Sequence, residues 1–242
     1  MSVSSDQTET AETSRRVWLF ALAAPREFQA ALEAYGLSGT QPRQWECVQT
    51  SARADLVWTG VGKANAAGGV ARVLDPIRHQ GVISVGIAGA MPGSGCNLGD
   101  VICASSSVFV DEGIGVPDGF VSCAQMGFPP FDNKTDSITH DHRVIEWLGP
   151  HADHIGPIAC VSLCSGTDEA AVRISSQHGV LAETMEGAAT ALAARRIDGA
   201  LMTGELRVIS NTTGDRNSQR WDLDGSLAIT AEVLGRIAEG LS

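Results

Sequence analysis

The sequence is poor in basic residues and in aromatic residues, and each shortage excludes a class of protein. Its 242 residues contain 17 Lys and Arg against 28 Asp and Glu, which gives a formal net charge of −11. Since nucleic acids and anionic membrane surfaces bind basic faces, we expect neither as a partner. Aromatic residues make up only 5%, whereas there are 27 glycines. This balance is typical of an α/β sheet with tight turns and closely packed helices.

Metal-binding spacing is also missing. None of the six cysteines forms a Cys-x-x-Cys pair, and the six histidines are not spaced with them as zinc ligands would be. A chain of this length with a large apolar fraction does not need disulfides to fold. We therefore expect reduced thiols, no bound metal and no cofactor.

No apolar run approaches the length of a membrane span. The first 14 residues are polar and lack the apolar core of a signal peptide, so we expect a disordered tail over 1–14 and a cytoplasmic protein. Nothing in 15–242 has the composition of a linker between domains. We expect one domain over that range.

Short apolar runs alternate with segments of helical spacing along the chain. This alternation predicts an α/β fold with a largely parallel sheet. The segment 111–136 is rich in Gly, Pro and Asp and is predicted to be a long surface loop, a kind of segment that is usually functional or mobile. The predicted strands are 17–24, 55–58, 81–86, 100–110, 158–163, 180–183 and 206–210, and the predicted helices are 27–35, 64–74, 187–196 and 223–241.

Polar residues follow several of these strands, where α/β proteins bind their ligands. In the segment Glu183-Thr184-Met185-Glu186-Gly187, two carboxylates flank a methionine just before a run of small residues. A carboxylate at such a helix start is favoured by the helix dipole, and the small residues let the helix approach a ligand closely. The ordinary explanation, a carboxylate that only serves its helix, is the more common one for such a pattern on its own.

Two further segments carry weaker signals. The strand 206–210 runs directly into Asn211, whose amide could bind a purine edge or simply cap a turn. The loop Gly60-Val61-Gly62-Lys63 suggests a dinucleotide site, but Asn65 stands where the third glycine of that motif belongs. A nucleotide-dependent oxidoreductase is therefore the weaker hypothesis.

Taken in order, these segments resemble the nucleoside phosphorylase/hydrolase superfamily. The resemblance rests on Glu27 after the first strand and on GVGKANAA, SVGIAGAMP, CSGTDEAA, ETMEGAA and LRVISN, and it extends over nearly the whole chain. It implies a three-layer α/β sandwich with a mixed, mostly parallel twisted central sheet. It also implies an enzyme that acts on purine nucleosides.

Within that superfamily the sequence is most similar to the futalosine hydrolases. Phosphorylases hold phosphate with an Arg and a Ser where this chain has Ser84 and Ile87, although Arg26 could still supply a cation. Adenine-specific nucleosidases place an Asp where Asn211 stands, and an amide suits a 6-oxopurine better. The C-terminal segment 216–222 also resembles the Arg…Trp-Asp motif of futalosine hydrolases. The implied reaction releases hypoxanthine from futalosine in menaquinone biosynthesis.

Three alternatives stay open. The first is a methylthioadenosine/S-adenosylhomocysteine nucleosidase. The second is a purine nucleoside phosphorylase, and the third is a nucleoside-binding protein without activity. The superfamily resemblance implies a homodimer or larger homo-oligomer, in which a neighbouring chain often closes the site.

The resemblance also implies roles for individual residues. Glu27 is expected to activate water, Glu186 to bind the ribose hydroxyls and Asn211 to bind the base at N7 or O6. Met185 is expected to pack against the ribose. Other residues expected to bind substrate are Ala88, Gly89, Asp168, Glu169, Ala170 and Trp221, with Glu169 standing where adenine nucleosidases often have a stacking phenylalanine.

Futalosine also carries a carboxyphenyl ketone, which needs an apolar slot and a cation. The candidates for the slot are Phe109, Phe120, Phe131 and Trp221, and the candidates for the cation are Arg43, Lys63 and Arg220.

Overall fold

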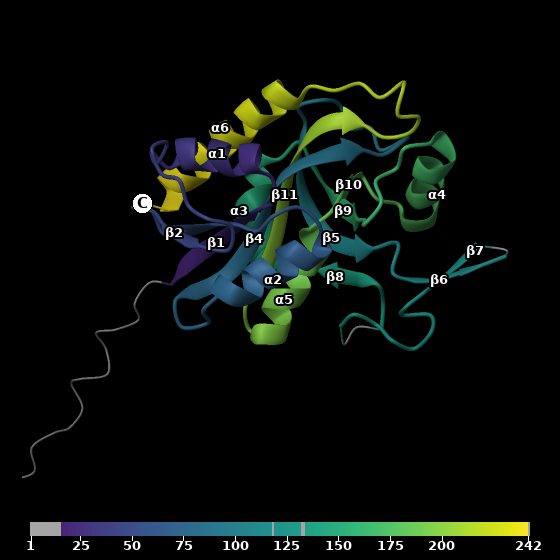
Figure 1. The fold of residues 1–242 in the computed structure, drawn as a ribbon, viewed down its shortest axis with the longest axis horizontal. Helices are drawn as coiled ribbons and strands as arrows, with labels where there is room; N and C mark the ends of the chain where they lie inside the picture. The colour runs from purple at the N-terminus through teal and green to yellow at the C-terminus, as the bar shows by residue number, and fades with distance from the viewer. Residues whose placement is uncertain (1–15, 118, 132–133, 242) are drawn as a thin grey trace, which may run out of the picture.

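The structure is a computed structural model that describes residues 16–117, 119–131 and 134–241 (Figure 1). The predicted tail at 1–14 lies outside the described residues. No helix in the described ranges is both long enough and apolar enough to span a membrane.

The strands and helices alternate along most of the chain, as the sequence predicts. The strands are β1 (Val17–Leu22), β2 (Cys47–Gln49), β3 (Ala54–Trp58), β4 (His79–Ala90), β5 (Val101–Phe109), β6 (Gly113–Val116), β7 (Gly119–Ser122), β8 (Ser137–Thr139), β9 (His154–Cys160), β10 (Ala182–Thr184) and β11 (Met202–Thr212). The helices are α1 (Pro25–Ala34), α2 (Lys63–Val73), α3 (His142–Leu148), α4 (Asp168–His178), α5 (Gly187–Ile197) and α6 (Leu223–Leu241), with one 3₁₀ turn at Gly149–His151.

The central sheet has the order β10-β9-β5-β11-β4-β1-β3-β2, with β8 paired to β5. Most pairs are parallel, while β2, β8, the β5–β11 pair and the β4–β10 pair are antiparallel. Because β10 pairs with β4 as well as with β9, the strands β4, β11, β5, β9 and β10 close on themselves. This closure brings the end of β10 beside β4, which separates it from β11.

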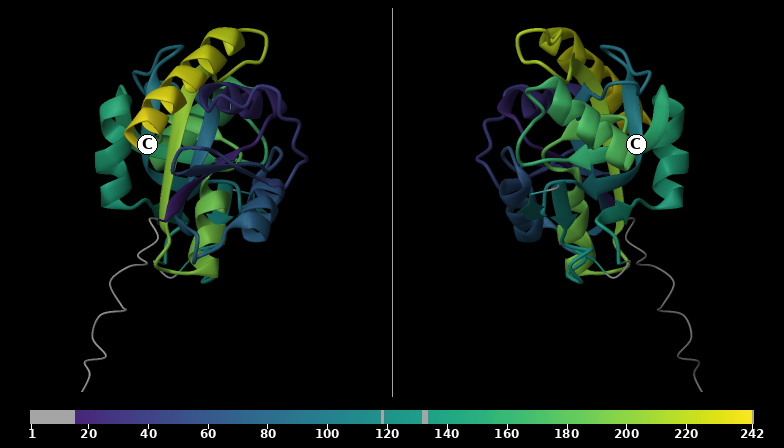
Figure 2. Two further views of the ribbon diagram at one scale, coloured as in Figure 1. Left: turned by 90° about the vertical axis from the view of Figure 1, so that its left-hand side faces the viewer. Right: turned by 90° about the vertical axis from the view of Figure 1, so that its right-hand side faces the viewer.

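Helices cover both faces of the sheet (Figures 1 and 2). Helices α1, α3 and α6 pack over one face, and α2 and α5 over the other. Strand β1 shows why its sequence is a continuous apolar run: Phe20 and Leu22 enter the first core and Leu19 enters the second. A strand buried on both faces has no polar side to alternate with. The predicted α/β fold with a mixed, mostly parallel sheet is confirmed.

Strand β4 is longer than the sequence predicts. We expected a loop after Gly86, but the strand continues to Ala90 because β11 pairs with it there, with Ile87 opposite Val208 and Ala88 opposite Ile209. The residues that follow Ile87, Ala88 to Ala90, are small and have little strand preference of their own. Pairing with a strand far along the chain decides their conformation.

Two regions contain more regular structure than expected. The predicted loop at 111–136 includes the hairpin of β6 and β7, which projects from the body of the protein (Figure 1). The residues Asp168, Glu169 and Ala170, which are expected to bind substrate, form the first turn of α4, a helix that the sequence analysis does not predict. Thr167 caps this helix by accepting a hydrogen bond from the Ala170 amide, and Gly179 ends it in the left-handed conformation.

Candidate active site

A cavity of about 400 Å³ opens toward the carboxyl ends of β1, β4, β10 and β11. The structure brings Glu27, Glu186 and Asn211 to this one cavity, although they come from three distant parts of the chain. Of the other residues expected to bind substrate, Ala88, Gly89, Met185 and Trp221 line it too. Its remaining lining residues are Ala23, Ala24, Val61, Ile87, Cys164, Ser165, Gly166, Glu183, Thr184, Ser210, Arg216 and Gln219.

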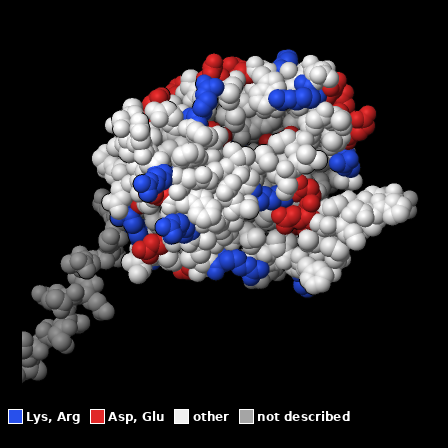
Figure 3. All heavy atoms as spheres, in the orientation of Figure 1, with Lys and Arg blue, Asp and Glu red and all other residues white. Residues whose placement is uncertain are grey.

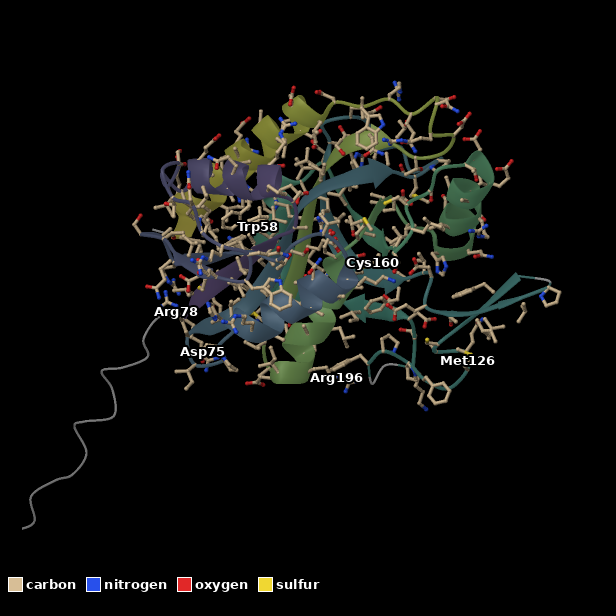
Figure 4. All side chains as sticks on the ribbon, in the orientation of Figure 1. Trp58, Asp75, Arg78, Met126, Cys160 and Arg196 are labelled. Carbon is tan, nitrogen blue, oxygen red and sulfur yellow. The ribbon has the colours of Figure 1, made fainter. Side chains whose placement is uncertain are left out.

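Glu27 lies in the first turn of α1, and backbone amides fix its carboxylate. One oxygen accepts hydrogen bonds from the amides of Ala23 (3.2 Å) and Ala24 (2.7 Å), and the other accepts from the amide of Ile87 (2.8 Å). Trp58, which lies below α1 in Figure 4, donates its indole N–H to the carbonyl of Ala23 and supports this turn. Because both oxygens accept hydrogen bonds from the backbone, the carboxylate is fixed in one orientation at the cavity.

Glu186 stands directly before α5 and is almost fully buried. Its Oε1 accepts a hydrogen bond from the Gly62 amide (3.0 Å), and its Oε2 lies 3.6 Å from Nη1 of Arg207. Burial raises the pKa of Glu186, Glu27 raises it further, and Arg207 and the Gly62 amide oppose that rise. The loop at Gly60–Lys63 therefore donates a hydrogen bond to a carboxylate of the protein, whereas its glycines had suggested a dinucleotide site.

Arg207 is a fully buried cation that connects the acids behind the cavity. It donates from Nε to Glu205 (2.9 Å) and from Nη2 to Ser84 (2.7 Å), in addition to its ion pair with Glu186. Burial disfavours the charged guanidinium, but the three acids Glu205, Glu186 and Glu27 outweigh this and raise the pKa of Arg207. Ser84 is 1% exposed and does not line the cavity, so its hydroxyl is not placed to hold phosphate there.

Glu205 is the acid that completes this buried network. Its carboxylate accepts hydrogen bonds from Ser107, from Thr184 (3.1 Å) and from Arg207 (2.9 Å). His140 hydrogen-bonds to Ser107 (2.8 Å), and burial lowers its pKa to about 4, so that it is neutral at pH 7. We did not single out Glu205 or Arg207 as candidate site residues. The signal that could have found them is the pair of opposite charges, Glu205 and Arg207, beside the apolar residues Leu206, Val208 and Ile209 of a predicted buried strand.

Two glycines are required by how closely these groups approach the backbone. A Cβ on Gly86 would collide with the carboxylate of Glu27 and lie 2.6 Å from Nη1 of Arg207. A Cβ on Gly187 would collide with the carboxylate of Glu205. The glycines of SVGIAGA and ETMEGAA thus make room for the charged network.

Asn211 lies near the end of β11, next to a bulge in its pairing with β4. Its Oδ1 accepts from the Ser210 hydroxyl (2.9 Å) and its Nδ2 donates to the Thr212 carbonyl (3.0 Å). A Cβ on Gly89 would lie 3.0 Å from Nδ2 of Asn211, so the amide packs over the bare backbone of Gly89. An isolated bridge between Asn211 and Trp221 brings the C-terminal motif to the same place.

Several predicted substrate contacts lie elsewhere. Asp168, Glu169 and Ala170 are outside the cavity, and the carboxylate of Asp168 accepts from the Asp215 amide (2.9 Å). Among the candidates for the apolar slot, only Trp221 lines the cavity. None of the three candidate cations lines it, and Lys63 pairs instead with Asp111 and Glu112.

Arg216 is the cation that the sequence analysis did not propose for this role. It is the only Lys or Arg among the described residues that line the cavity, and its guanidinium lies 4.8 Å from the ring centroid of Trp221. Arg26 forms an ion pair with Asp224 at the surface and does not line the cavity. Elsewhere on the face in Figure 3, acidic and basic side chains are interspersed, with no extended basic area.

Cys47, Asp55 and His79 form a group whose potential ligand atoms lie within 4.8 Å of one another. Arg78 already donates to both oxygens of Asp55 (2.5 and 2.9 Å), and His79 lies 3.1 Å from the same carboxylate. Although burial opposes ionisation, Arg78 and His79 lower the pKa of Asp55 to about 2. A guanidinium in this position competes with a metal cation, and Arg78 lies at the end of the sheet away from the cavity (Figure 4).

Comparison with known proteins places this chain in a family. The model of the phosphorylase superfamily matches residues 23–241. The futalosine hydrolase of Acidothermus cellulolyticus is 35% identical over 221 residues, covering 88% of this chain and 86% of that protein. The futalosine hydrolase of Streptomyces coelicolor is 29% identical, covering 76% of this chain and 78% of that protein.

Solved structures show the same fold. A 5′-methylthioadenosine/S-adenosylhomocysteine nucleosidase from S. pneumoniae, solved with a transition-state inhibitor, has a TM-score of 0.72 at 21% identity and covers 93% of this chain and 99% of its own. A futalosine hydrolase mutant of Helicobacter pylori has a TM-score of 0.71 at 17% identity and covers 93% of this chain and all of its own (100%). The chain therefore belongs to the phosphorylase superfamily and, within it, to the family of futalosine hydrolases.

Proposed function

We propose that this protein hydrolyses the N-ribosidic bond of futalosine and releases hypoxanthine and dehypoxanthine futalosine. Three of its matching curated relatives are futalosine hydrolases, which supports the substrate. The observation that carries the proposal is the convergence of Glu27, Glu186 and Asn211 on one cavity. Two acids and an amide are the groups that a bond between a sugar and a purine needs in order to break by hydrolysis.

The sugar becomes cationic as this bond breaks, in a transition state that resembles an oxocarbenium ion. Glu186 accepts hydrogen bonds from the ribose 2′- and 3′-hydroxyls, and its negative charge favours the cation. Met185 packs against the ribose. Arg207, 3.6 Å from Glu186, supports the ionised state of that carboxylate from the side away from the cavity.

Glu27 positions the attacking water and takes its proton. Its three backbone donors fix the carboxylate, so that the water it binds has a defined place relative to the sugar. Asn211 donates to N7 or O6 of the base as negative charge develops there. An amide stabilises the leaving purine without acting as a full proton donor.

Water is the nucleophile in this proposal because the cavity offers little to hold phosphate. A phosphate dianion is usually bound by arginine forks or by several amide donors. Ser84 does not line the cavity, the Ile87 amide donates to Glu27, and Arg26 pairs with Asp224 at the surface. Arg216 lines the cavity but stacks on Trp221 and donates to Gln219. A purine nucleoside phosphorylase is therefore the weaker alternative.

Arg216 and Trp221 are proposed to bind the carboxyphenyl end of futalosine. The guanidinium stacks on the indole and also donates to Oε1 of Gln219 (2.8 Å), which holds it at the edge of the cavity. A planar cation beside an aromatic ring can pair with a carboxylate while the ring contacts the phenyl group. The 5′-methylthio group of methylthioadenosine has no charge for Arg216 to bind.

The test compares the base released from futalosine and from methylthioadenosine. We expect kcat/KM for futalosine to exceed that for methylthioadenosine by on the order of 10²-fold, because the smaller substrate lacks the contact with Arg216 and its base suits Asn211 less well. In Arg216→Met we expect KM for futalosine to rise about tenfold, the equivalent of one charge-assisted hydrogen bond, with little change for inosine.

Arg236→Met is the matched control, since Arg236 pairs with Glu232 on α6 and does not line the cavity. Faster release of adenine than of hypoxanthine by the unmodified protein would contradict the proposed substrate.

We further propose a cytoplasmic homodimer or larger homo-oligomer, built from one domain over 15–242. The projecting β6–β7 hairpin and the segment after it expose apolar side chains, among them Ile114, Phe120 and Phe128. Leu163, beside the cavity-lining loop, is also exposed. Apolar side chains gathered in one region are typical of a surface that another chain covers.

A further inference from the structure

Glu183 is a buried acid in the cavity for which the proposed mechanism has no task. It lies in β10, is 5% exposed and lines the cavity together with Glu186. A buried carboxylate is costly unless it is hydrogen-bonded or binds a ligand. The residues around Glu183 therefore indicate the role of its carboxylate.

Glu183 and Asn211 lie on either side of the same glycine. Glu183 pairs with Gly89 across the β10–β4 ladder, and Asn211 pairs with Gly89 across the β11–β4 ladder. Residues in register on neighbouring strands project from the same face of a sheet. The two side chains thus project from one face, and their backbones are two strand spacings or about 10 Å apart, with the backbone of Gly89 between them.

This arrangement suits a flat ligand that is bound at two neighbouring edges. Ala88 and Gly89 both line the cavity, and the Asn211 amide packs where a Cβ of Gly89 would stand. A purine that lies between the two side chains can meet Asn211 at N7 or O6 and Glu183 at N1, on two neighbouring edges of the ring system. The ribose then lies toward Glu186 and Met185.

The carboxylate of Glu183 retains the capacity to accept a further hydrogen bond. Its partners are the amide of Ser165 (2.9 and 3.1 Å) and the hydroxyl of the same serine (2.7 Å). An ionised carboxylate has about four acceptor positions, so it is not saturated. Burial raises the pKa of Glu183, and the donors from Ser165 oppose this rise and favour the ionised form.

We propose that Glu183 determines base specificity by accepting a hydrogen bond from N1–H of a 6-oxopurine. Hypoxanthine carries a proton on N1, whereas adenine presents a lone pair there, which an ionised carboxylate repels. Asn211 binds the neighbouring edge of the same base, at N7 or O6. This inference rests on the proposed function and adds the residue that distinguishes a 6-oxopurine from a 6-aminopurine.

The test measures binding of the free bases hypoxanthine and adenine by calorimetry. We expect the unmodified protein to prefer hypoxanthine, and Glu183→Gln to reduce this preference by tenfold or more. The glutamine amide can accept from N1–H of hypoxanthine and can also donate to N1 of adenine, so it discriminates poorly between the two bases. Glu239→Gln, at an exposed position on α6, is the matched control.

A second ligand makes the result independent of how well Glu183→Gln folds. 1-Methylhypoxanthine has no N1–H, so the unmodified protein should bind it at least tenfold more weakly than hypoxanthine. If Glu183→Gln weakens both bases equally, or if 1-methylhypoxanthine binds the unmodified protein as well as hypoxanthine does, the inference is wrong while the proposed function stands. Preference of the unmodified protein for adenine would overturn the proposed function itself.

Discussion

Glu27→Gln is expected to lower kcat for futalosine by on the order of 10²- to 10⁴-fold, the range that a general base contributes. The neutral amide cannot take a proton from water. It also places an NH₂ group against one of the three backbone donors that the carboxylate now satisfies, at Ala23, Ala24 or Ile87. The proposed base is thus lost together with its fixed orientation.

Glu33→Gln is the matched control for this change. Glu33 lies in the same helix, is exposed and accepts only a surface hydrogen bond from Gln29 (3.2 Å). Its replacement should leave kcat within about twofold, as is usual for surface substitutions. If Glu27→Gln keeps its thermal stability and retains more than a third of the activity, Glu27 is not the base.

Arg207→Met is expected to reduce the free energy of unfolding by about 3–5 kcal/mol, the usual result of leaving a buried charge without its partner. Glu205 is fully buried and loses its hydrogen bond from Nε, and Glu186 loses its nearest cation. Chemical denaturation of the variant measures the loss. In Arg236→Met, which breaks an exposed ion pair, the change should stay below about 1 kcal/mol.

A double variant separates the lost charge pair from the lost packing. Glu205→Gln in the Arg207→Met background removes the uncompensated charge, so part of the stability should return. A double variant no more stable than Arg207→Met would show that the ion pair with Glu205 does not account for the loss.

The single variant Arg207→Met should also shift the pH dependence of activity. Glu186 must be ionised to accept from the ribose hydroxyls, so activity is present above its pKa and is lost as pH falls through it. Burial raises the pKa of Glu186 and Arg207 lowers it. Without Arg207 the pKa of Glu186 rises further, and the acid limb of the kcat profile should move to higher pH.

The sequence predicts well those elements whose residues interact mainly with their chain neighbours. Helix α6 was predicted at its observed bounds, and β1 was recognised as a buried strand, because a continuous apolar run or a helical spacing is visible locally. The placement of Glu27 and Asn211 followed from the rule that ligands bind beyond the carboxyl ends of strands. The structure brings both to one cavity.

What the sequence could not predict depends on contacts between distant segments. The extension of β4 past Gly86 depends on β11, more than a hundred residues later. The pairing of β10 with β4, which places Glu183 opposite Gly89, leaves no local pattern either. The same holds for Arg216, whose position follows from its stacking on Trp221.

The central claim is that two buried acids and an amide break a sugar–purine bond with water as the nucleophile. It is tested most directly by measuring hypoxanthine release from futalosine in phosphate-free buffer, with the ribosyl product identified by mass spectrometry. The account predicts full activity without phosphate, with the free sugar as product. Release only in the presence of phosphate, with a sugar 1-phosphate as product, would contradict it.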